Sequence, residues 1–260
     1  MIRVLVVIPT YREKENIVRL IPEVRSVVAR EGYDGHVLVI DDSSPDGTGH
    51  AVRQMAGVDS SLHLLERPGK LGLGSAYLDG FRWSLDLLSP DVFVTMDADF
   101  SHPPSSLPSL VRAVVAGADV AVGSRYTQGG GAADWASSRQ LVSRVANALV
   151  HILLGLTVRD ATSGFRALSR RAVEVLLKVE FASKGYAYQV ESLYTYFHSG
   201  LTVAEVPFLF LGRSAGKTKL SVSEMLLFAV RVVNLRLRGW QKAQDSPRIG
   251  TKLKYRRLRK

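Results

Sequence analysis

The sequence predicts an α/β fold built on a mostly parallel, doubly wound sheet. Short runs of apolar, mainly β-branched residues alternate along the chain with segments of helical period. The apolar runs are continuous, which is typical of strands that helices cover on both faces. With 260 residues and 46% hydrophobic content, the chain can bury one sizeable core.

The expected elements follow in a regular βα order. A first strand is expected over 4–8, and the helix after it places apolar residues on one face, namely Ile17, Leu20, Ile21, Val24 and Val28. Further strands are expected over 37–41, 62–66, 92–96 and 119–123, and further helices after Asp46, over about 72–87 and near 107–115. No internal repeat is visible.

Positive charge is concentrated at one end of the chain. Residues 1–211 hold 20 Lys+Arg and 22 Asp+Glu, net −2, whereas residues 212–260 hold 14 and 2, net +12. This asymmetry predicts an enzyme-like body and a C-terminal segment that meets an anionic surface, either a membrane or a nucleic acid.

Other features bear on the location of the protein. Absence of cysteine excludes disulfides and thiolate metal sites, which fits a cytosolic location. We expect no export signal, because the apolar stretch at 4–8 is too short for one. We also expect no spanning helix, because the longest charge-free apolar stretch, 145–158, falls short of the ~20 residues needed.

Acidic residues follow the ends of predicted strands, where the loops of such sheets bind ligands. The pair Asp97 and Asp99 forms a D-x-D at one strand end, and carboxylates are the ligands that magnesium or manganese needs to neutralise a diphosphate. Alternatively, Asp99 caps the next helix and Asp97 is an ordinary loop residue.

Residues after the first two strands could bind a nucleoside. Asp42 could accept a hydrogen bond from a ribose or base, while Asp46 and Gly47 begin the following helix. Glu13 either reaches a nucleobase or is a solvent-exposed residue at a helix start.

Six ordered blocks carry a family resemblance: VVIPTYREKENI, VIDDSSPDGT, GLGSAYLDGF, MDADFSHPP, VGSRYTQGG and DATSGFRA. Together they resemble the polyprenol (dolichyl) phosphate mannose synthases, within the inverting glycosyltransferase family 2 with the GT-A fold. The resemblance covers about residues 3–220. It implies transfer of mannose from GDP-mannose to a polyprenyl phosphate, with Mg²⁺ or Mn²⁺ as cofactor.

The resemblance also implies roles for single residues. Donor-binding positions would be Pro9, Tyr11, Glu13, Ile40, Asp42, Asp97, Ala98, Asp99, Arg125, Lys184, Arg213 and Lys219. Asp97, Asp99 and Ser101 would bind the metal. Some relatives carry Gln, a further metal ligand, at the position of Ser101. His102 either replaces this third ligand or has a structural role. Asp99 and Arg125 would be the catalytic residues. Arg139 and Ser143 would hold the acceptor phosphate, although Arg139 also fits a solvent-facing helix position.

No strong base is expected in such a reaction. A phosphate monoester is largely anionic at neutral pH, its second pKa being near ~6, so positioning and charge neutralisation can supply most of the catalysis. The lipid phosphate oxygen would attack the anomeric carbon in line, with inversion, and the nucleoside diphosphate would leave. The 162–166 segment, which follows Asp160, is expected to pack beneath the acceptor site in a structural role.

The C-terminal part fits a lipid acceptor. We expect a catalytic domain over 1–220, an amphipathic helix over 221–243 that docks on the body or on a membrane, and a basic tail over 244–260 without fixed structure. Residues 248–260 carry seven Lys+Arg and no acid. The protein would then work at the cytoplasmic face of an anionic membrane, as a peripheral protein. Some relatives depend on a separate membrane subunit, so a membrane-protein partner is left open.

Three other functions compete with this one. The same fold could use another nucleotide sugar, such as UDP-glucose, or another acceptor. Water could replace the acceptor, so that the nucleotide sugar is hydrolysed. A basic nucleic-acid-binding protein is the alternative from a different class, and it is disfavoured because the body is not basic.

Overall fold

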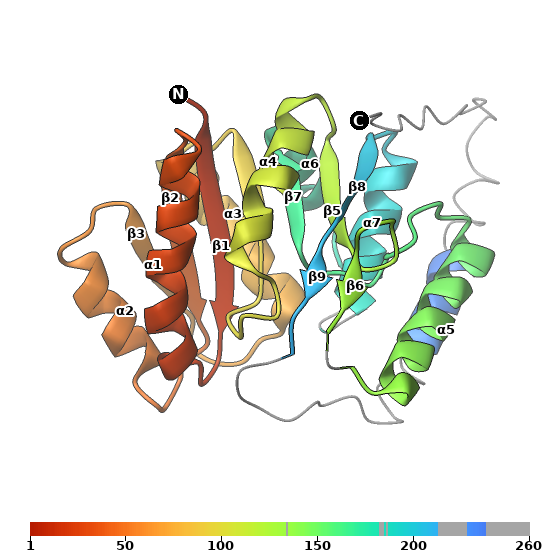
Figure 1. The fold of residues 1–260 in the computed structure, drawn as a ribbon, viewed down its shortest axis with the longest axis horizontal. Coiled ribbons are helices and arrows are strands. Elements are labelled where there is room, and N and C mark those ends of the chain that lie inside the picture. The colour runs from red at the N-terminus through yellow and green to blue at the C-terminus, as the bar shows by residue number, and fades with distance from the viewer. Residues whose placement is uncertain (134, 182–184, 186, 213–227, 238–260) are drawn as a thin grey trace.

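The computed structural model describes residues 1–133, 135–181, 185, 187–212 and 228–237. A seven-stranded sheet in the order β3-β2-β1-β4-β7-β5-β8 forms its centre (Figure 1). Its strands are β1 (Arg3–Thr10), β2 (Asp34–Asp41), β3 (Leu62–Glu66), β4 (Val92–Thr95), β5 (Val120–Ser124), β7 (Arg166–Ser169) and β8 (Val203–Pro207). All pairs are parallel except those of β7, which runs antiparallel to both β4 and β5. The prediction of a mostly parallel α/β sheet is therefore confirmed.

Helices cover both faces of the sheet, as the continuous apolar strands require. One face carries α1 (Lys14–Arg30), α2 (Thr48–Ala56), η1 (Pro104–Ser106) and α4 (Leu107–Val115), and the other carries α3 (Leu73–Leu87), α6 (Arg170–Leu177) and α7 (Ala187–His198). The apolar face predicted for α1 is buried throughout. Alternate strand residues feed two separate cores, one on each face.

A smaller unit lies beside the carboxyl end of β5. The strands β6 (Gly131–Ala132) and β9 (Leu209–Phe210) pair with each other, and α5 (Ser137–Leu154) follows β6. The apolar stretch 145–158 forms the second half of α5 and its C-terminal connection. Within the described ranges, no helix has the length and apolar character needed to cross a membrane.

The predicted amphipathic helix is described only over 228–237, which is helical. Val232 is fully buried in the core, and Phe228 and Leu235 pack beside it. Val233 and Leu237 of the same segment are 44% and 53% exposed. The described part of the helix therefore contacts the body through Val232 and leaves two apolar side chains exposed. The rest of 221–243 and the tail lie outside the described residues.

Candidate active site

The carboxyl ends of β1, β2 and β4 gather the predicted acidic residues. We call Asp41, Asp42, Asp97 and Asp99 the acidic edge, because they end or follow two parallel strands on either side of β1. All but Asp97 are buried. The side chain of Asp97 is 39% exposed, so it is the member of this group that solvent or a ligand reaches most readily.

Hydrogen bonds hold the loop after β2 in shape. Asp41 accepts from the backbone N–H of Ser44 at 2.9 Å and from the hydroxyl of Thr10 at 3.0 Å. Asp46 accepts from the backbone N–H groups of Thr48 and Lys14, at 3.1 and 3.2 Å, and so serves the starts of both α2 and α1. Burial alone would raise the pKa of Asp46, but these hydrogen bonds lower it. The turn and helix start predicted for this loop are confirmed.

Asp42 is held by an arginine that the sequence did not single out. Arg67 donates from Nε to Oδ1 at 2.7 Å and from Nη2 to Oδ2 at 2.9 Å, and both side chains are buried. Arg67 also donates to Ser75 and Asp79 of α3. A carboxylate has about four lone-pair sites, so Asp42 keeps accepting capacity for a ribose while Arg67 fixes its position.

The other residues predicted for nucleotide binding differ in what they can offer. Ile40 is completely buried and would meet a Cβ added at Gly80, so its side chain belongs to the core and only its main chain is available. The ring of Tyr11 lies under the Lys70 ammonium at 4.7 Å. Glu13 accepts from the Asn16 amide at 2.7 Å. Pro9 is half-buried at the end of β1, opposite Ile40.

The loop after β4 is tightly constrained around the D-x-D. Asp99 accepts from the backbone N–H of Ser101 at 3.1 Å, and Phe100 between them has φ of +63°, a left-handed conformation that is costly for a bulky residue. Ala98 is buried, with 4% of its surface exposed. The backbone of Leu211 donates to the Ser101 carbonyl at 3.2 Å and ties this loop to the end of β9.

Ser101 and His102 differ in their capacity to bind a metal. The Ser101 hydroxyl is buried and has no hydrogen-bond partner in the described chain, which is unusual for such a group. His102 accepts from the Asp97 N–H through Nδ1 at 2.9 Å, and its ring stacks on Phe165 at 4.8 Å. Complete burial lowers the pKa of His102. The structural role of His102 therefore accounts for its contacts.

Within the part of the chain that the structure describes, no three His, Asp or Glu side chains gather as a ready-made metal site. Asp97, Asp99 and the unsatisfied Ser101 hydroxyl nevertheless offer hard oxygen atoms on one loop. Magnesium commonly binds through one or two carboxylates and completes its shell with water and substrate phosphates. These residues fit that mode of binding.

A second group of residues lies beyond β5. We call Arg125, Trp135, Arg139 and Phe210 the cation–aromatic cluster. The guanidinium carbons of Arg125 and Arg139 lie 4.9 and 4.2 Å from the centre of the Trp135 ring, and the Phe210 ring meets Trp135 edge-on at 5.1 Å. Such contacts favour a fixed guanidinium orientation.

Arg125 is anchored by Asp160, which is fully buried. Nε and Nη2 donate to the two carboxylate oxygens at 2.7 and 2.6 Å, and Nη2 also donates to Thr162 at 3.0 Å. Burial disfavours the charge of Arg125, but the hydrogen bonds and charge of Asp160 outweigh this effect and raise its pKa. Thr162, in the segment expected to pack beneath the acceptor site, contacts Arg125 through the same guanidinium.

The first half of α5 carries Arg139 and Ser143. The Ser143 carbonyl accepts from Asn147 at 2.9 Å, and Asn147 also donates to Thr162, which connects α5 to the loop that holds Arg125. The predicted acceptor residues are thus connected to Arg125 through one polar network and one aromatic ring. Lys184, Arg213 and Lys219 lie outside the described residues.

Aromatic packing connects the two groups. Phe210 belongs to the cation–aromatic cluster and lies 6.1 Å from the His102 ring, which also contacts Phe165 and Phe208. His102 in turn holds the backbone of Asp97. Sequence reasoning missed Arg67, Trp135 and Phe210. Only the aromatic character of the latter two was a signal, and nothing in the sequence indicated the partner of Asp42.

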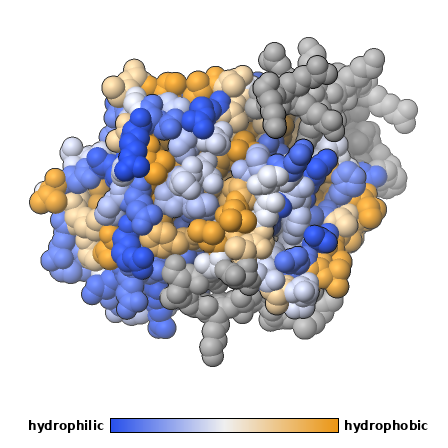
Figure 2. All heavy atoms as spheres, in the orientation of Figure 1, coloured by the Kyte–Doolittle hydropathy of each residue, from blue (hydrophilic) through white to orange (hydrophobic). Residues whose placement is uncertain are grey.

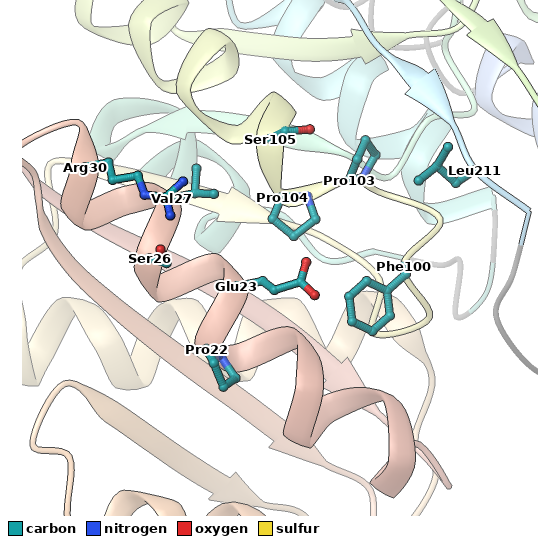
Figure 3. Close-up of a pocket in the computed structure, with 10 residues that line it drawn as sticks. All are labelled: Pro22, Glu23, Ser26, Val27, Arg30, Phe100, Pro103, Pro104, Ser105 and Leu211. Carbon is teal, nitrogen blue, oxygen red and sulfur yellow. The ribbon is translucent and has the colours of Figure 1, made fainter.

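A cavity of about 540 Å³ lies apart from these groups, on the helical face between α1 and η1 (Figure 3). Pro22, Val27, Phe100, Pro104 and Leu211 are among the residues that line it. None of its ten lining residues is one of the predicted site residues. The cavity approaches the acidic edge only through Phe100.

The comparison with known families identifies the chain as a glycosyltransferase. Residues 5–177 match the model of glycosyl transferase family 2, and the chain belongs to that family.

Two curated relatives are similar over most of their length. A polyprenol monophosphomannose synthase of Mycolicibacterium smegmatis is 40% identical over 238 residues, 91% of this chain and 88% of the relative. An undecaprenyl-phosphate mannosyltransferase of Micrococcus luteus is 41% identical over 219 residues, 84% of this chain and 88% of the relative.

Solved structures support the fold assignment. Glucosyl-3-phosphoglycerate synthase from Mycobacterium tuberculosis, in complex with Mn²⁺, uridine diphosphate and glucosyl-3-phosphoglycerate, matches with a TM-score of 0.63. The match is 22% identical and covers 91% of this chain and 79% of that one. The same enzyme with Mg²⁺ and uridine diphosphate matches with a TM-score of 0.62, at 22% identity over 91% of this chain and 78% of that one. At this identity the likeness shows a shared fold.

Proposed function

We propose that the protein transfers mannose from GDP-mannose to a polyprenyl phosphate, with inversion and with a divalent metal ion. The observation that carries the proposal is the pairing of an acidic edge with a cation–aromatic cluster, because the reaction joins a diphosphate donor to a phosphate acceptor. The names of the two curated relatives support the lipid phosphate and the mannose. Membership of a glycosyltransferase family leaves the nucleic-acid-binding alternative without support.

The donor would lie across the acidic edge. Asp42, held by Arg67, would accept from the ribose, and Tyr11 and Glu13 would lie near the base. Asp97 and Asp99 would hold the metal, with Ser101 as a further oxygen ligand. When bound, the metal would neutralise the charge that develops on the leaving diphosphate.

The acceptor phosphate would lie at the cation–aromatic cluster, against Arg125 and Arg139. Asp160 engages Nε and Nη2 of Arg125. Nη1 would then donate to the phosphate. Asp160, the buried carboxylate beside this cluster, is bound to Arg125. This arrangement supports a mechanism in which the acceptor enters as an anion and no carboxylate removes a proton from it.

A membrane surface would present such an acceptor. The residues Leu141, Val145 and Ile152 of α5 recur at helical spacing and are 63%, 59% and 76% exposed. Figure 2 shows hydrophobic residues at the margin of this face where α5 lies. Exposed Arg144 and the basic C-terminal residues would add attraction to anionic lipid. We propose that the protein binds the cytoplasmic face of a membrane peripherally, with this side toward the lipid.

The test is a transfer assay with purified protein, Mg²⁺ or Mn²⁺, labelled GDP-mannose and vesicles that contain a polyprenyl phosphate. Label should enter the lipid phase, and a chelator should stop it. Polyprenol without phosphate is the matched acceptor control and should receive no label. Transfer from UDP-glucose in place of GDP-mannose would replace the donor assignment, and release of free mannose alone would indicate a hydrolase. Anomeric analysis of the product tests inversion.

A further inference from the structure

Trp135 lies at the centre of the cation–aromatic cluster, between the end of β6 and the start of α5. Its ring is contacted by the guanidinium groups of Arg125 and Arg139, which come from different elements of the fold. The edge contact with Phe210 and the hydrogen bond from the Gln140 amide to the Trp135 carbonyl, at 3.4 Å, help to fix the residue. Trp135 therefore sets the relative position of the two arginines.

The indole N–H of Trp135 is unusual. Nε1 is buried and has no hydrogen-bond partner in the described part of the chain. A buried donor without a partner is destabilising, and buried Trp N–H groups usually find one. Because Nε1 belongs to the ring that both guanidinium groups contact, an acceptor that satisfies it would lie close to two positive charges. The chemistry that fits is an anion with several oxygen atoms.

We propose that Trp135 binds the acceptor phosphate directly, with its indole N–H donating to a non-bridging phosphate oxygen, and that its ring holds Arg125 and Arg139 at the spacing which that phosphate requires. This inference rests on the proposed function and adds to it a neutral donor. An indole N–H can donate but cannot accept, and an anionic phosphate oxygen is a stronger acceptor for it than an alcohol oxygen.

Kinetics on one pair of variants separate the two roles of the residue. Trp135→Phe keeps a ring for the guanidinium groups and removes the N–H. We expect the KM for polyprenyl phosphate to rise about 10-fold or more, while the KM for GDP-mannose stays unchanged. Trp83→Phe is the matched control. Trp83 belongs to α3, and its ring centre lies 5.3 Å from that of His63, outside the cation–aromatic cluster. This variant should leave the KM values for both substrates unchanged.

A spectroscopic readout needs no stable variant. The chain has three tryptophans, Trp83, Trp135 and Trp240, so three indole ¹⁵N–¹H signals are expected. With Mg²⁺ present, a short isoprenyl phosphate should move the Trp135 signal downfield and leave the Trp83 signal in place. The corresponding isoprenol should move neither.

The outcomes distinguish this inference from the function on which it rests. If the wild-type protein transfers mannose but Trp135→Phe behaves like Trp83→Phe, or the Trp135 signal stays in place with saturating isoprenyl phosphate, the inference is wrong and the proposed function stands. If no phosphate-bearing lipid accepts sugar from the wild-type protein, both are overturned.

Discussion

The D-x-D loop and the cation–aromatic cluster are organised by different means. In the D-x-D loop, the backbone N–H of Ser101 donates to Asp99 and Asp97 stays partly exposed, whereas Asp42, at the end of β2, is held by the buried Arg67. In the cation–aromatic cluster, Arg125 is enclosed by aromatic rings and paired with a carboxylate that has no exposed surface. We therefore expect the loss of a D-x-D carboxylate to cost less stability than the loss of Asp160, the buried partner of Arg125.

The largest expected effect tests this contrast through stability. Asp160→Ala would leave the buried charge of Arg125 without its partner, and we expect a loss of about 3–5 kcal/mol in the free energy of unfolding, measured by urea denaturation. Glu66→Ala is the control, because it removes an ion pair with Arg53 in which both side chains are about half exposed, and it should cost less than about 1 kcal/mol. Equal losses in the two variants would contradict the contrast.

Removing a carboxylate of the D-x-D loop should lower the transfer activity more than the stability. Asp99→Ala removes a proposed metal ligand, and we expect transfer to fall by about 10²–10³-fold, since metal stabilisation of a leaving group amounts to several kcal/mol. Urea denaturation should show a smaller loss of stability than in Asp160→Ala. Asp86→Ala, at an exposed position of α3, is the matched control. Full metal-dependent activity in Asp99→Ala would refute the D-x-D assignment.

A smaller effect is expected at the outer face of α5. Replacing Leu141, Val145 and Ile152 together by serine should weaken binding to anionic vesicles by about 10-fold or more, because each side chain loses apolar area that could enter the lipid. Co-sedimentation measures the binding, and Val58→Ser, at a position that is 91% exposed, is the control. Binding of the triple variant at wild-type strength would place the membrane contact elsewhere.

The smallest effect concerns a histidine pair remote from both site groups. His36 and His63 lie 3.1 Å apart through their ring nitrogens. Burial lowers the pKa of both, and the charge of His36 lowers that of His63 further, although Asp34 opposes the shift at His36. The unfolded chain, with ordinary histidine pKa values near 6.5, therefore binds more protons than the folded protein as the pH falls.

The melting temperature should accordingly fall as the pH is lowered from about 7 to about 5. His102 contributes in the same direction, so the variant His63→Gln should reduce this dependence without removing it. Thermal unfolding followed by circular dichroism at several pH values measures the effect. An unchanged dependence in His63→Gln would show that the pair does not control it.

The sequence predicts the two regions unequally. The strands and helices of the first 124 residues follow from continuous apolar runs and amphipathic periodicity, and the strand-end carboxylates follow from the parallel topology. The antiparallel strand β7 is only four residues long and sits between β4 and β5, so no periodic pattern marks it. The short pair β6 and β9 has two residues in each strand. Elements of this length are set by tertiary contacts.

The partners of the functional residues were equally hard to predict. Arg67 is 25 residues from Asp42, and Asp160 is 35 residues from Arg125, so each pair depends on the folded arrangement and not on local sequence. The resemblance predicts functional roles for Arg125 and Asp42. The polar and aromatic groups that position them emerge only when the sheet brings separate loops together.

The hydrogen bond from the Leu211 backbone to the Ser101 carbonyl gives this protein a natural reporter. Leu211 directly follows β9 and is not one of the predicted ligands, yet its amide hydrogen is protected only while the D-x-D loop keeps its shape. The exchange of that single amide with deuterated water therefore measures how often the loop opens, on a timescale of minutes to hours. Comparing this exchange rate with and without a divalent ion shows whether the ion stabilises the loop. The comparison requires no substitution of Asp97 or Asp99.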